Sequence, residues 1–260
     1  YLFVIPMIDV QALTFSYSSS PPIFEDFHWR VQSGETWAVL GPSGCGKTTL
    51  LYLLAGLRFP TSGSIRINGE PLTRPRPQTG LILQEYGLLP WATVRENASL
   101  GLHIRKFYGA DGIHAPRTPL PTDDVTPWLS RLGLLDVQEK YPSQISGGQR
   151  QRTAIARTLA LQPDLLLMDE PFSSLDAPTR EDLQNLTLAL CREQDITLVL
   201  VTHAIEEAAF LGRKILLLST PPNRTPLIVD NPQAGEATYR HSPAYAALCR
   251  DLRHKMETMR

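Results

Sequence analysis

The stretch Gly41-Pro42-Ser43-Gly44-Cys45-Gly46-Lys47-Thr48 carries most of the information about this chain. It matches the phosphate-loop pattern, in which a glycine, four variable residues, a second glycine, a lysine and a serine or threonine follow one another. Glycines let successive backbone N–H groups point at one anion, and the start of the following helix adds partial positive charge. The stretch therefore predicts a site for the phosphates of a nucleoside triphosphate.

Single residues of this loop have separate predicted roles. Lys47 is expected to reach the β- and γ-phosphates, and the Thr48 hydroxyl is expected to bind Mg²⁺, which prefers hard oxygen ligands. A helix N-terminus can lower the pKa of a thiol, so we hypothesise that Cys45 is reactive and that its alkylation blocks nucleotide binding. The predicted nucleotide-binding set is Gly41, Pro42, Ser43, Gly44, Cys45, Gly46, Lys47, Thr48 and Thr49.

The sequence around the loop has the strand–loop–helix setting that the pattern requires. Residues 36–40 are typical of a short buried strand, and residues 49–55 have a helical pattern that ends at Gly56. The apolar run 164–168 is typical of a parallel strand buried on both faces, and strand and helix patterns alternate from there to Leu218. We therefore expect an α/β fold with a P-loop NTPase core.

Other segments add to this core. The runs 8–15 and 24–31 alternate between apolar and polar residues, which predicts an antiparallel β-layer. Helical patches follow residue 86 and surround a Gly/Pro-rich stretch at 109–121, which indicates an inserted helical subdomain. Residues 239–256 have the apolar spacing of a closing helix. The predicted organisation is a nucleotide-binding domain over 7–230, with the helical subdomain at about 86–160, and a C-terminal helical extension over 231–260.

Composition limits the classes of function. The chain has 260 residues, 42% of them hydrophobic, and can bury a full core. A formal net charge of −1 disfavours nucleic acid as a partner.

No apolar run approaches the roughly 18 residues that cross a bilayer, and residues 1–8 lack signal-peptide features, which predicts a cytosolic chain. Three scattered cysteines are expected to be reduced. Because Met7 to Val10 is typical of the start of a first strand, the sequence leaves open whether residues 1–6 are native.

Two carboxylates follow the buried strand at 164–168. Asp169 and Glu170 fall at its carboxyl end, where open α/β sheets bind ligands. Their side chains point to different sides, so Asp169 can hold the Mg²⁺ shell while Glu170 polarises an attacking water. The structural alternative is that Asp-Glu-Pro only begins a turn.

A second glycine-rich segment, residues 145–149, precedes a helix with several arginines. We interpret it as a second nest of N–H groups at a helix N-terminus, and hence as a second anion site. A chain with one phosphate loop has no obvious use for two such sites in the same pocket.

Taken together, the ordered motifs resemble the ATP-binding cassette (ABC) ATPase family over roughly residues 8–218. The resemblance implies an ABC ATPase fold and a head-to-tail dimer, with an identical copy expected as the second ATPase subunit. Two ATP molecules, with Mg²⁺, would be sandwiched between the phosphate loop of one subunit and the glycine-rich segment of the other. The motifs are 41–48, Gln84, the segment Ser146, Gly147, Gly148 and Gln149, the Asp169–Glu170 pair, 173–176 and 202–203.

The resemblance also implies roles for single residues. Glu170 would be the general base, Gln84 would contact Mg²⁺ and the attacking water, and His203 would contact the γ-phosphate. Asp176 would link the two sites across the dimer. Tyr17 would stack on adenine, with an ordinary strand aromatic as the alternative. The implied metal ligands are Thr48, Gln84 and Asp169.

Residues 84–97, with Leu-Leu-Pro-Trp at 88–91, resemble the importers of nitrate, sulfonate and taurine. Residues 218–224 resemble their Pro-Gly-Arg turn with Asn223 in place of glycine, and residues 241–245 resemble the start of their last helix. The resemblance implies the ATPase subunit of an importer, peripheral on the cytoplasmic face of the inner membrane. It would drive a separate permease and serve an extracytoplasmic solute-binding protein indirectly.

Trp91 is expected to dock on the permease, with a core-capping role as the alternative. Two alternatives remain for the whole chain. One is a paired ABC exporter. The other is a mechanical ABC ATPase of DNA repair or ribosomes, which usually has coiled-coil inserts or two cassettes in one chain, and neither is seen in this sequence.

Overall fold

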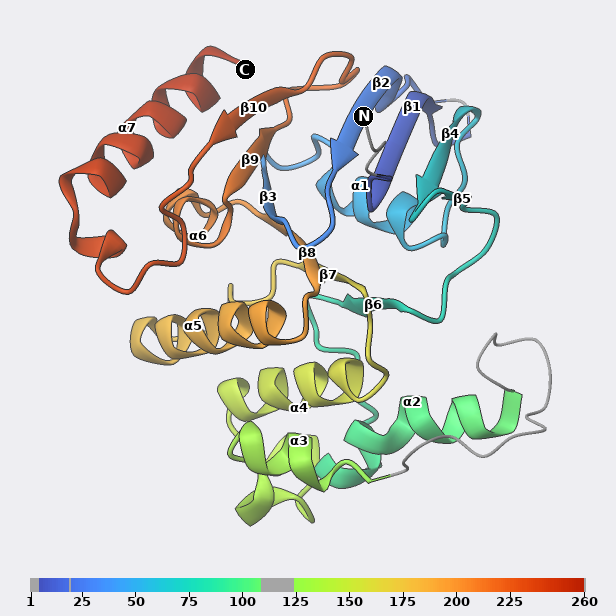
Figure 1. Ribbon diagram of the computed structural model, residues 1–260, viewed down its shortest axis with the longest axis vertical. Coiled ribbons are helices and arrows are strands. Elements are labelled where there is room, and N and C mark those ends of the chain that lie inside the picture. Colours follow the sequence, from blue (N-terminus) through green and yellow to red (C-terminus); the bar gives the residue numbers. More distant parts are fainter. Residues whose placement is uncertain (1–4, 19, 109–123, 260) are drawn as a thin grey trace.

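The computed structural model describes residues 5–18, 20–108 and 124–259. An antiparallel sheet has the strand order β2-β1-β4-β5, and a second sheet has the order β10-β9-β3-β8-β7-β6 (Figure 1). The second sheet is parallel except for β10, which pairs antiparallel with β9. The strands are β1 Ile8–Phe15, β2 Phe24–Val31, β3 Thr36–Leu40, β4 Ser62–Ile67, β5 Glu70–Pro71, β6 Thr79–Ile82, β7 Leu165–Asp169, β8 Thr197–Thr202, β9 Lys214–Leu217 and β10 Leu227–Asp230.

Helices cover the second sheet and form a group of their own at one end of the molecule, where α2, α3 and α4 lie together (Figure 1). The α-helices are α1 Lys47–Leu54, α2 Val94–Tyr108, α3 Thr126–Arg131, α4 Gly147–Leu159, α5 Ala177–Glu193, α6 Ile205–Leu211 and α7 Pro243–Thr258. The 3-10 turns are η1 Leu135–Val137, η2 Pro142–Gln144 and η3 Tyr239–His241. Among the described residues, none of these helices has the length and apolar content to cross a membrane.

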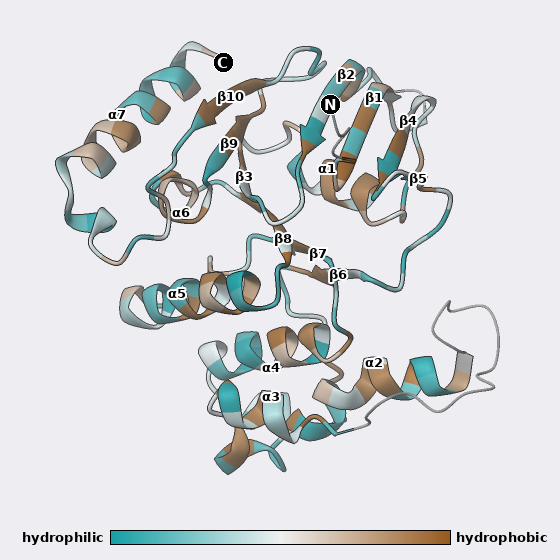
Figure 2. Cartoon of the chain, viewed as in Figure 1, coloured by the Kyte–Doolittle hydropathy of each residue, from teal (hydrophilic) through white to brown (hydrophobic). Residues whose placement is uncertain are grey.

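The central strands are buried on both faces, which explains their continuous apolar runs (Figure 2). On β7, Leu166 and Met168 pack with the helices, while Leu165 and Leu167 pack toward α1 and the antiparallel sheet. Truncation of such a leucine to alanine typically costs about 2–5 kcal/mol. The sheet is therefore a rigid base from which the loops at its carboxyl edge extend.

The predicted α/β fold with an antiparallel β-layer is confirmed. The closing helix predicted at 239–256 is wrong in one respect, because Tyr239–His241 is a separate 3-10 turn and α7 begins at Pro243. Ser242 caps α7 by accepting a hydrogen bond from the Tyr245 N–H, and a proline without an N–H fits the first turn of a helix. Strand β10 had no prediction, and the stretch 109–121 lies outside the described residues.

Candidate functional site

The phosphate loop joins β3 to α1 at the carboxyl edge of the parallel sheet. Gly44 and Gly46 have φ angles of 80° and 105°, which other residues rarely adopt. Lys47 Nζ donates to the main-chain oxygens of Gly41 at 2.9 Å and Pro42 at 3.0 Å. The lysine is therefore folded across its own loop, with its ammonium group bonded to two carbonyl oxygens of that loop.

Thr48 and Asp169 form the part of the site that suits a metal ion. The Thr48 hydroxyl donates to Asp169 Oδ1 at 3.3 Å. Burial raises the pKa of Asp169, the hydrogen bond from Thr48 partly opposes this, and the Glu170 carboxylate adds to the rise. A cation bound there would favour the charged form of Asp169. In the described part of the chain, no three His, Cys, Asp or Glu side chains are grouped so that they could hold a metal ion by themselves. A hydroxyl and one carboxylate, completed by phosphate and water, fit Mg²⁺.

Glu170 lies at the centre of a cluster formed by three neighbouring strands. His203, after β8, places Nδ1 3.0 Å from Glu170 Oε1, and Gln84, after β6, donates from Nε2 to Glu170 Oε2 at 3.4 Å. Strand β7 lies between β6 and β8, so their carboxyl ends meet. Glu170 has a φ of 44° and its N–H donates to the Val201 oxygen, so its backbone is held in a turn that few carboxylate residues adopt.

Tyr17 lies beside the start of α1. Its hydroxyl is 3.3 Å from Thr49 Oγ1, its ring packs edge-on against Phe15, and the Arg58 guanidinium lies 6.0 Å from its ring centroid. Tyr17 as a whole remains 39% exposed, so solvent reaches part of this side chain.

The segment 146–149 begins α4 as a plain helix N-terminus. Ser146 Oγ accepts from the Gln149 N–H at 3.2 Å, and Gln149 Oε1 accepts from the Ser146 N–H at 3.0 Å, which is a capping box. Neither Gly147 nor Gly148 has positive φ, so the predicted nest is wrong in its geometry. The small residue at 148 is needed for close packing, since a Cβ there would lie 2.6 Å from Thr179 Cγ2 of α5.

Asp176 caps α5 by accepting hydrogen bonds from the N–H and the hydroxyl of Thr179. Its carboxylate is exposed, and the hydrogen bonds from Thr179 lower its pKa. Within the described residues, no recorded hydrogen bond or ion pair joins Asp176 or the segment 146–149 to residues 41–49. One copy of the chain thus unites the phosphate loop with Asp169, Glu170, His203 and Gln84, and presents the other two motifs elsewhere.

The loop between Gln84 and α2 presents Trp91, which is 74% exposed and therefore caps no core within the described chain. Asn97 holds this loop, because its buried amide donates to the oxygens of Leu89, Ala92 and Thr93 and its Oδ1 accepts from the Leu89 N–H. Asn97, the last residue of the stretch 84–97, therefore has a structural role in this loop.

The same loop is bonded to α4 and to the segment just before α5. Arg157 of α4 donates to the oxygens of Tyr86 and Gly87, and the Tyr86 hydroxyl lies 2.5 Å from Ser174 Oγ, just before Asp176. Sequence reasoning missed Tyr86 and Arg157 as connecting residues. Their partners are about 70 and 88 positions away, so no local pattern reveals them.

Cys45 is buried, and burial raises the pKa of its thiol, with the Lys47 charge only partly offsetting this. The predicted low thiol pKa is therefore wrong. Desolvation of the thiolate outweighs the Lys47 charge and the backbone hydrogen bonds at this position. None of the three cysteines, all buried, forms a disulfide.

Comparison with known proteins assigns this arrangement. The pattern of the family described as "ABC transporter" matches residues 24–173. The chain belongs to the ABC transporter family. It is 42% identical over 221 residues to the taurine import ATP-binding protein TauB of Escherichia coli, covering 84% of this chain and 82% of TauB. It is 38% identical over 250 residues to the nitrate import ATP-binding protein NrtD of Synechococcus elongatus, covering 92% and 87%.

Solved structures agree with this ABC assignment. A dimeric ATP-binding cassette in a post-hydrolysis state with ADP and Pi is 27% identical, with a TM-score of 0.71, over 86% of this chain and 98% of that one. The protein cbiO1 of Clostridium perfringens, part of the ABC transporter complex cbiONQ, is 24% identical with a TM-score of 0.75 over 97% and 99%, and supports the fold alone. The predicted ABC ATPase fold and ATPase class are confirmed.

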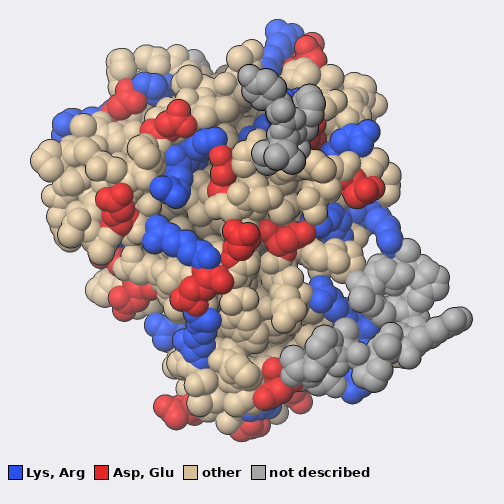
Figure 3. Space-filling view, viewed as in Figure 1, with Lys and Arg blue, Asp and Glu red and all other residues tan. Residues whose placement is uncertain are grey.

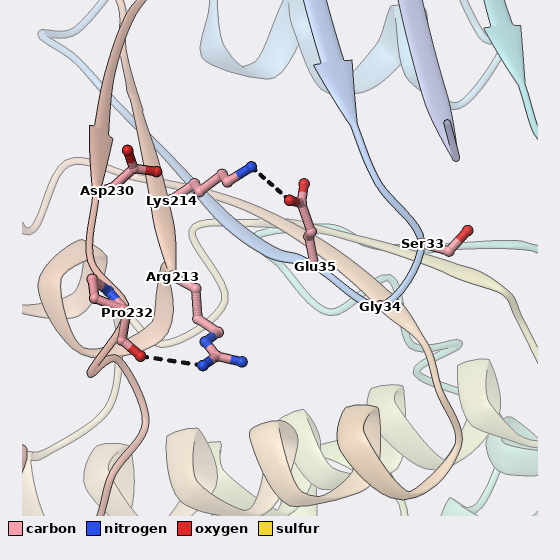
Figure 4. Close-up of a pocket in the computed structure, with 7 residues that line it drawn as sticks. All are labelled: Ser33, Gly34, Glu35, Arg213, Lys214, Asp230 and Pro232. Atoms are coloured by element: carbon pink, nitrogen blue, oxygen red, sulfur yellow. Dashed lines mark hydrogen bonds and ion pairs between the residues drawn. The ribbon is translucent and has the colours of Figure 1, made fainter. Parts of the chain in front are cut away.

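A cavity of about 410 Å³ lies at the opposite, amino-end edge of the sheet in this ABC protein (Figure 4). Lys214 donates to Glu35 Oε1 at 2.6 Å, and Arg213 donates to the Pro232 oxygen. Burial raises the pKa of Glu35, but hydrogen bonds from Lys214, Gln32 and Trp37 outweigh it and lower the pKa overall. The lining includes no residue of the nucleotide motifs.

Surface charge is mixed. On the face in Figure 3, basic and acidic side chains are interspersed over the described residues. Such a face does not offer the continuous basic area that binds a nucleic-acid backbone.

Proposed function

We propose that this chain is the ATP-hydrolysing subunit of an importer that takes up a small anion, of the taurine or nitrate kind, through a separate permease. The observation that carries the proposal is the contact of Glu170 with His203 and Gln84 beside a complete phosphate loop. The two import proteins TauB and NrtD, similar over most of the chain, support import and the solute class.

In this proposal the phosphate loop binds ATP. Backbone N–H groups of residues 41–48 receive the phosphates, and Lys47 exchanges its bonds to the loop oxygens for phosphate oxygens. Tyr17, which is 39% exposed, stacks its ring on adenine. Both groups lie at the start of α1, so one ligand can reach them together.

Glu170 acts as the general base on the attacking water. A carboxylate only accepts hydrogen bonds, so His203 Nδ1 and Gln84 Nε2 both donate to it and fix its orientation. Its remaining lone pairs can take the water proton. Mg²⁺, held by Thr48 and Asp169 with Gln84 as a predicted third ligand, would supply charge neutralisation at the phosphates.

The segment 146–149, in which Ser146 is exposed, and the exposed Asp176 serve a second copy of the chain. A helix N-terminus with free N–H groups favours an anion, and here it does not contact the phosphate loop of its own subunit. The partner subunit therefore completes the binding site around the nucleotide, and hydrolysis requires the dimer.

The Trp91 loop is the proposed permease contact, which places the subunit peripherally on the cytoplasmic membrane face. Trp91 is 74% exposed, and Leu83, next to Gln84, is 37% exposed. The bonds of Tyr86 to Ser174 and of Arg157 to the loop connect this surface to the dimer-facing motifs. Closure of the dimer can thus move the permease contact.

The test is affinity capture of the tagged chain from membranes in mild detergent, with mass spectrometry of the captured proteins. We expect an integral permease and ATPase activity in the captured complex. Trp91→Ala should lose the permease, while Ile228→Ala, a change at a 42% exposed apolar residue on β10, should retain it. Capture of ribosomal or DNA-repair proteins without a membrane partner would refute the transport role.

A further inference from the structure

Asn223 lies in the turn after β9, and only 5% of it is exposed. Its Nδ2 donates to the main-chain oxygen of Cys45, inside the phosphate loop, at 2.9 Å, and to that of Ile23 at 3.2 Å. Its Oδ1 accepts from the Ser219 N–H at 2.9 Å. Both amide donors and the acceptor are therefore used, and one side chain joins three separate segments.

The main chain holds Asn223 in place independently of its side chain. Its N–H donates to the Ile23 oxygen at 2.9 Å, and its own oxygen accepts from the Glu25 N–H at 3.0 Å. The start of β2 thus fixes the point from which the amide reaches Cys45.

The bond to Cys45 sets the direction of the next N–H group. In a trans peptide, the carbonyl of one residue and the N–H of the next lie in one plane and point in opposite directions. Holding the Cys45 oxygen toward Asn223 therefore turns the Gly46 N–H to the opposite side of that peptide. Gly46 has a φ of 105° and no side chain of its own that could fix this peptide. Ile23 packs so closely against Gly46 that a Cβ there would lie 2.4 Å from Ile23 Cγ2.

We propose that Asn223 is a positioning residue for nucleotide binding. It presets the peptide between Cys45 and Gly46 so that the Gly46 N–H is ready for a phosphate oxygen, and it ties this peptide to the segment that leads from Tyr17 into β2. The inference rests on the proposed nucleotide site. Preorganisation lowers the ordering cost of binding, so its loss affects nucleotide affinity rather than turnover at saturation.

Asn223→Asp is the decisive variant, because it keeps the shape and the acceptor for Ser219 but places an oxygen where Nδ2 donated. We expect the Kd for Mg-ADP, measured by calorimetry at pH 7.5, to rise about tenfold, equivalent to about 1.4 kcal/mol. The KM for ATP should rise similarly, with kcat within about twofold.

A pH series separates this role from general support of the fold. A carboxylate facing two carbonyl oxygens has a raised pKa, and protonation at pH 5.5 returns one donor, so the variant-to-wild-type ratio of Kd should fall. The nearby charged or titratable groups are Lys47, whose Nζ lies 4.0 Å from the Cys45 thiol, and the Arg224–Glu25 pair at 2.9 Å. The wild-type protein has the same neighbouring groups, so their titration cancels in the ratio of variant Kd to wild-type Kd.

Two further variants complete the experiment. Ser219→Ala removes only a hydroxyl that reaches Oδ1 at 3.4 Å, and its Kd should stay within about twofold of wild type. Asn223→Gly keeps both main-chain bonds, and should bind about tenfold more weakly without recovery at low pH. It also serves if Asn223→Asp fails to fold.

The proposal is overturned if a folded Asn223→Asp or Asn223→Gly variant binds Mg-ADP within about twofold of wild type. Failure of wild type itself to bind Mg-ADP is a different result, which refutes the proposed nucleotide site.

Discussion

Replacing Gly148 by alanine tests the packing between α4 and α5, the two helices that begin at the segment 146–149 and at Asp176. The new Cβ would lie 2.6 Å from Thr179 Cγ2, whereas carbon atoms in contact prefer roughly 3.5–4.0 Å. Thr179 cannot rotate away freely, because β-branched side chains are stiff in helices and its hydroxyl donates to Asp176 at 3.1 Å. The two helices must therefore separate by about 1 Å at this point.

The expected magnitude is a balance of two terms. Overpacking of this kind costs about 1–3 kcal/mol, and alanine in a helix gains up to about 1 kcal/mol over glycine. We expect a net loss of about 1–2 kcal/mol in the free energy of unfolding, measured by urea denaturation. The corresponding fall in Tm is about 2–4 °C for each kcal/mol.

A double-mutant cycle identifies the cause. Thr179→Ser removes the methyl group and keeps the hydroxyl that binds Asp176, so combining it with Gly148→Ala should restore stability. Gly147→Ala is the matched control, because its nearest neighbour would be Leu175 Cδ2 at an ordinary 3.4 Å. A Gly148→Ala variant as stable as wild type, or a cycle without coupling, would refute the reasoning.

Four other predictions concern single side chains. Lys47→Ala loses the loop ammonium, so the Kd for ATP should rise on the order of 10–100-fold, and an unchanged Kd would remove Lys47 from the site. Glu170→Gln should bind ATP and form a stable dimer on sizing columns while turnover falls about 10²–10⁴-fold, and undiminished hydrolysis would exclude Glu170 as the base. Burial raises the pKa of Glu207, with its hydrogen bonds from Thr202 and Gln184 only partly opposing this. Because the pKa of Glu207 is higher in the folded state, the folded state loses stability as pH rises above the ordinary pKa of 4.5. Glu207→Gln should reduce this loss. Curves of unfolding free energy against pH that run parallel for wild type and variant would contradict this prediction. Burial raises the pKa of Cys191 to about 12, so alkylation of the native protein at pH 7.5 should leave this thiol unmodified, and denaturant should expose it; rapid native labelling would show that the site opens.

The local features of the site could be predicted from the sequence. The glycine positions of the phosphate loop and the buried runs before it and at 164–168 follow from residues a few positions apart. Such features depend on backbone conformation and nearby hydrogen bonds, which short segments specify. The resemblance to a known family supplied the roles, and comparison confirmed the family.

Contacts across long sequence separations depend on the order of the strands and on side-chain packing. Gln84 meets Glu170 across 86 positions because β6 and β7 are neighbours, and Asn223 reaches Cys45 across 178 positions because β9 pairs with β3. The same holds for the thiol of Cys45, whose pKa is raised because the folded chain buries it. Periodicity and spacing report which residues face a core, but not which loops meet at its edge, since that follows only from the folded sheet.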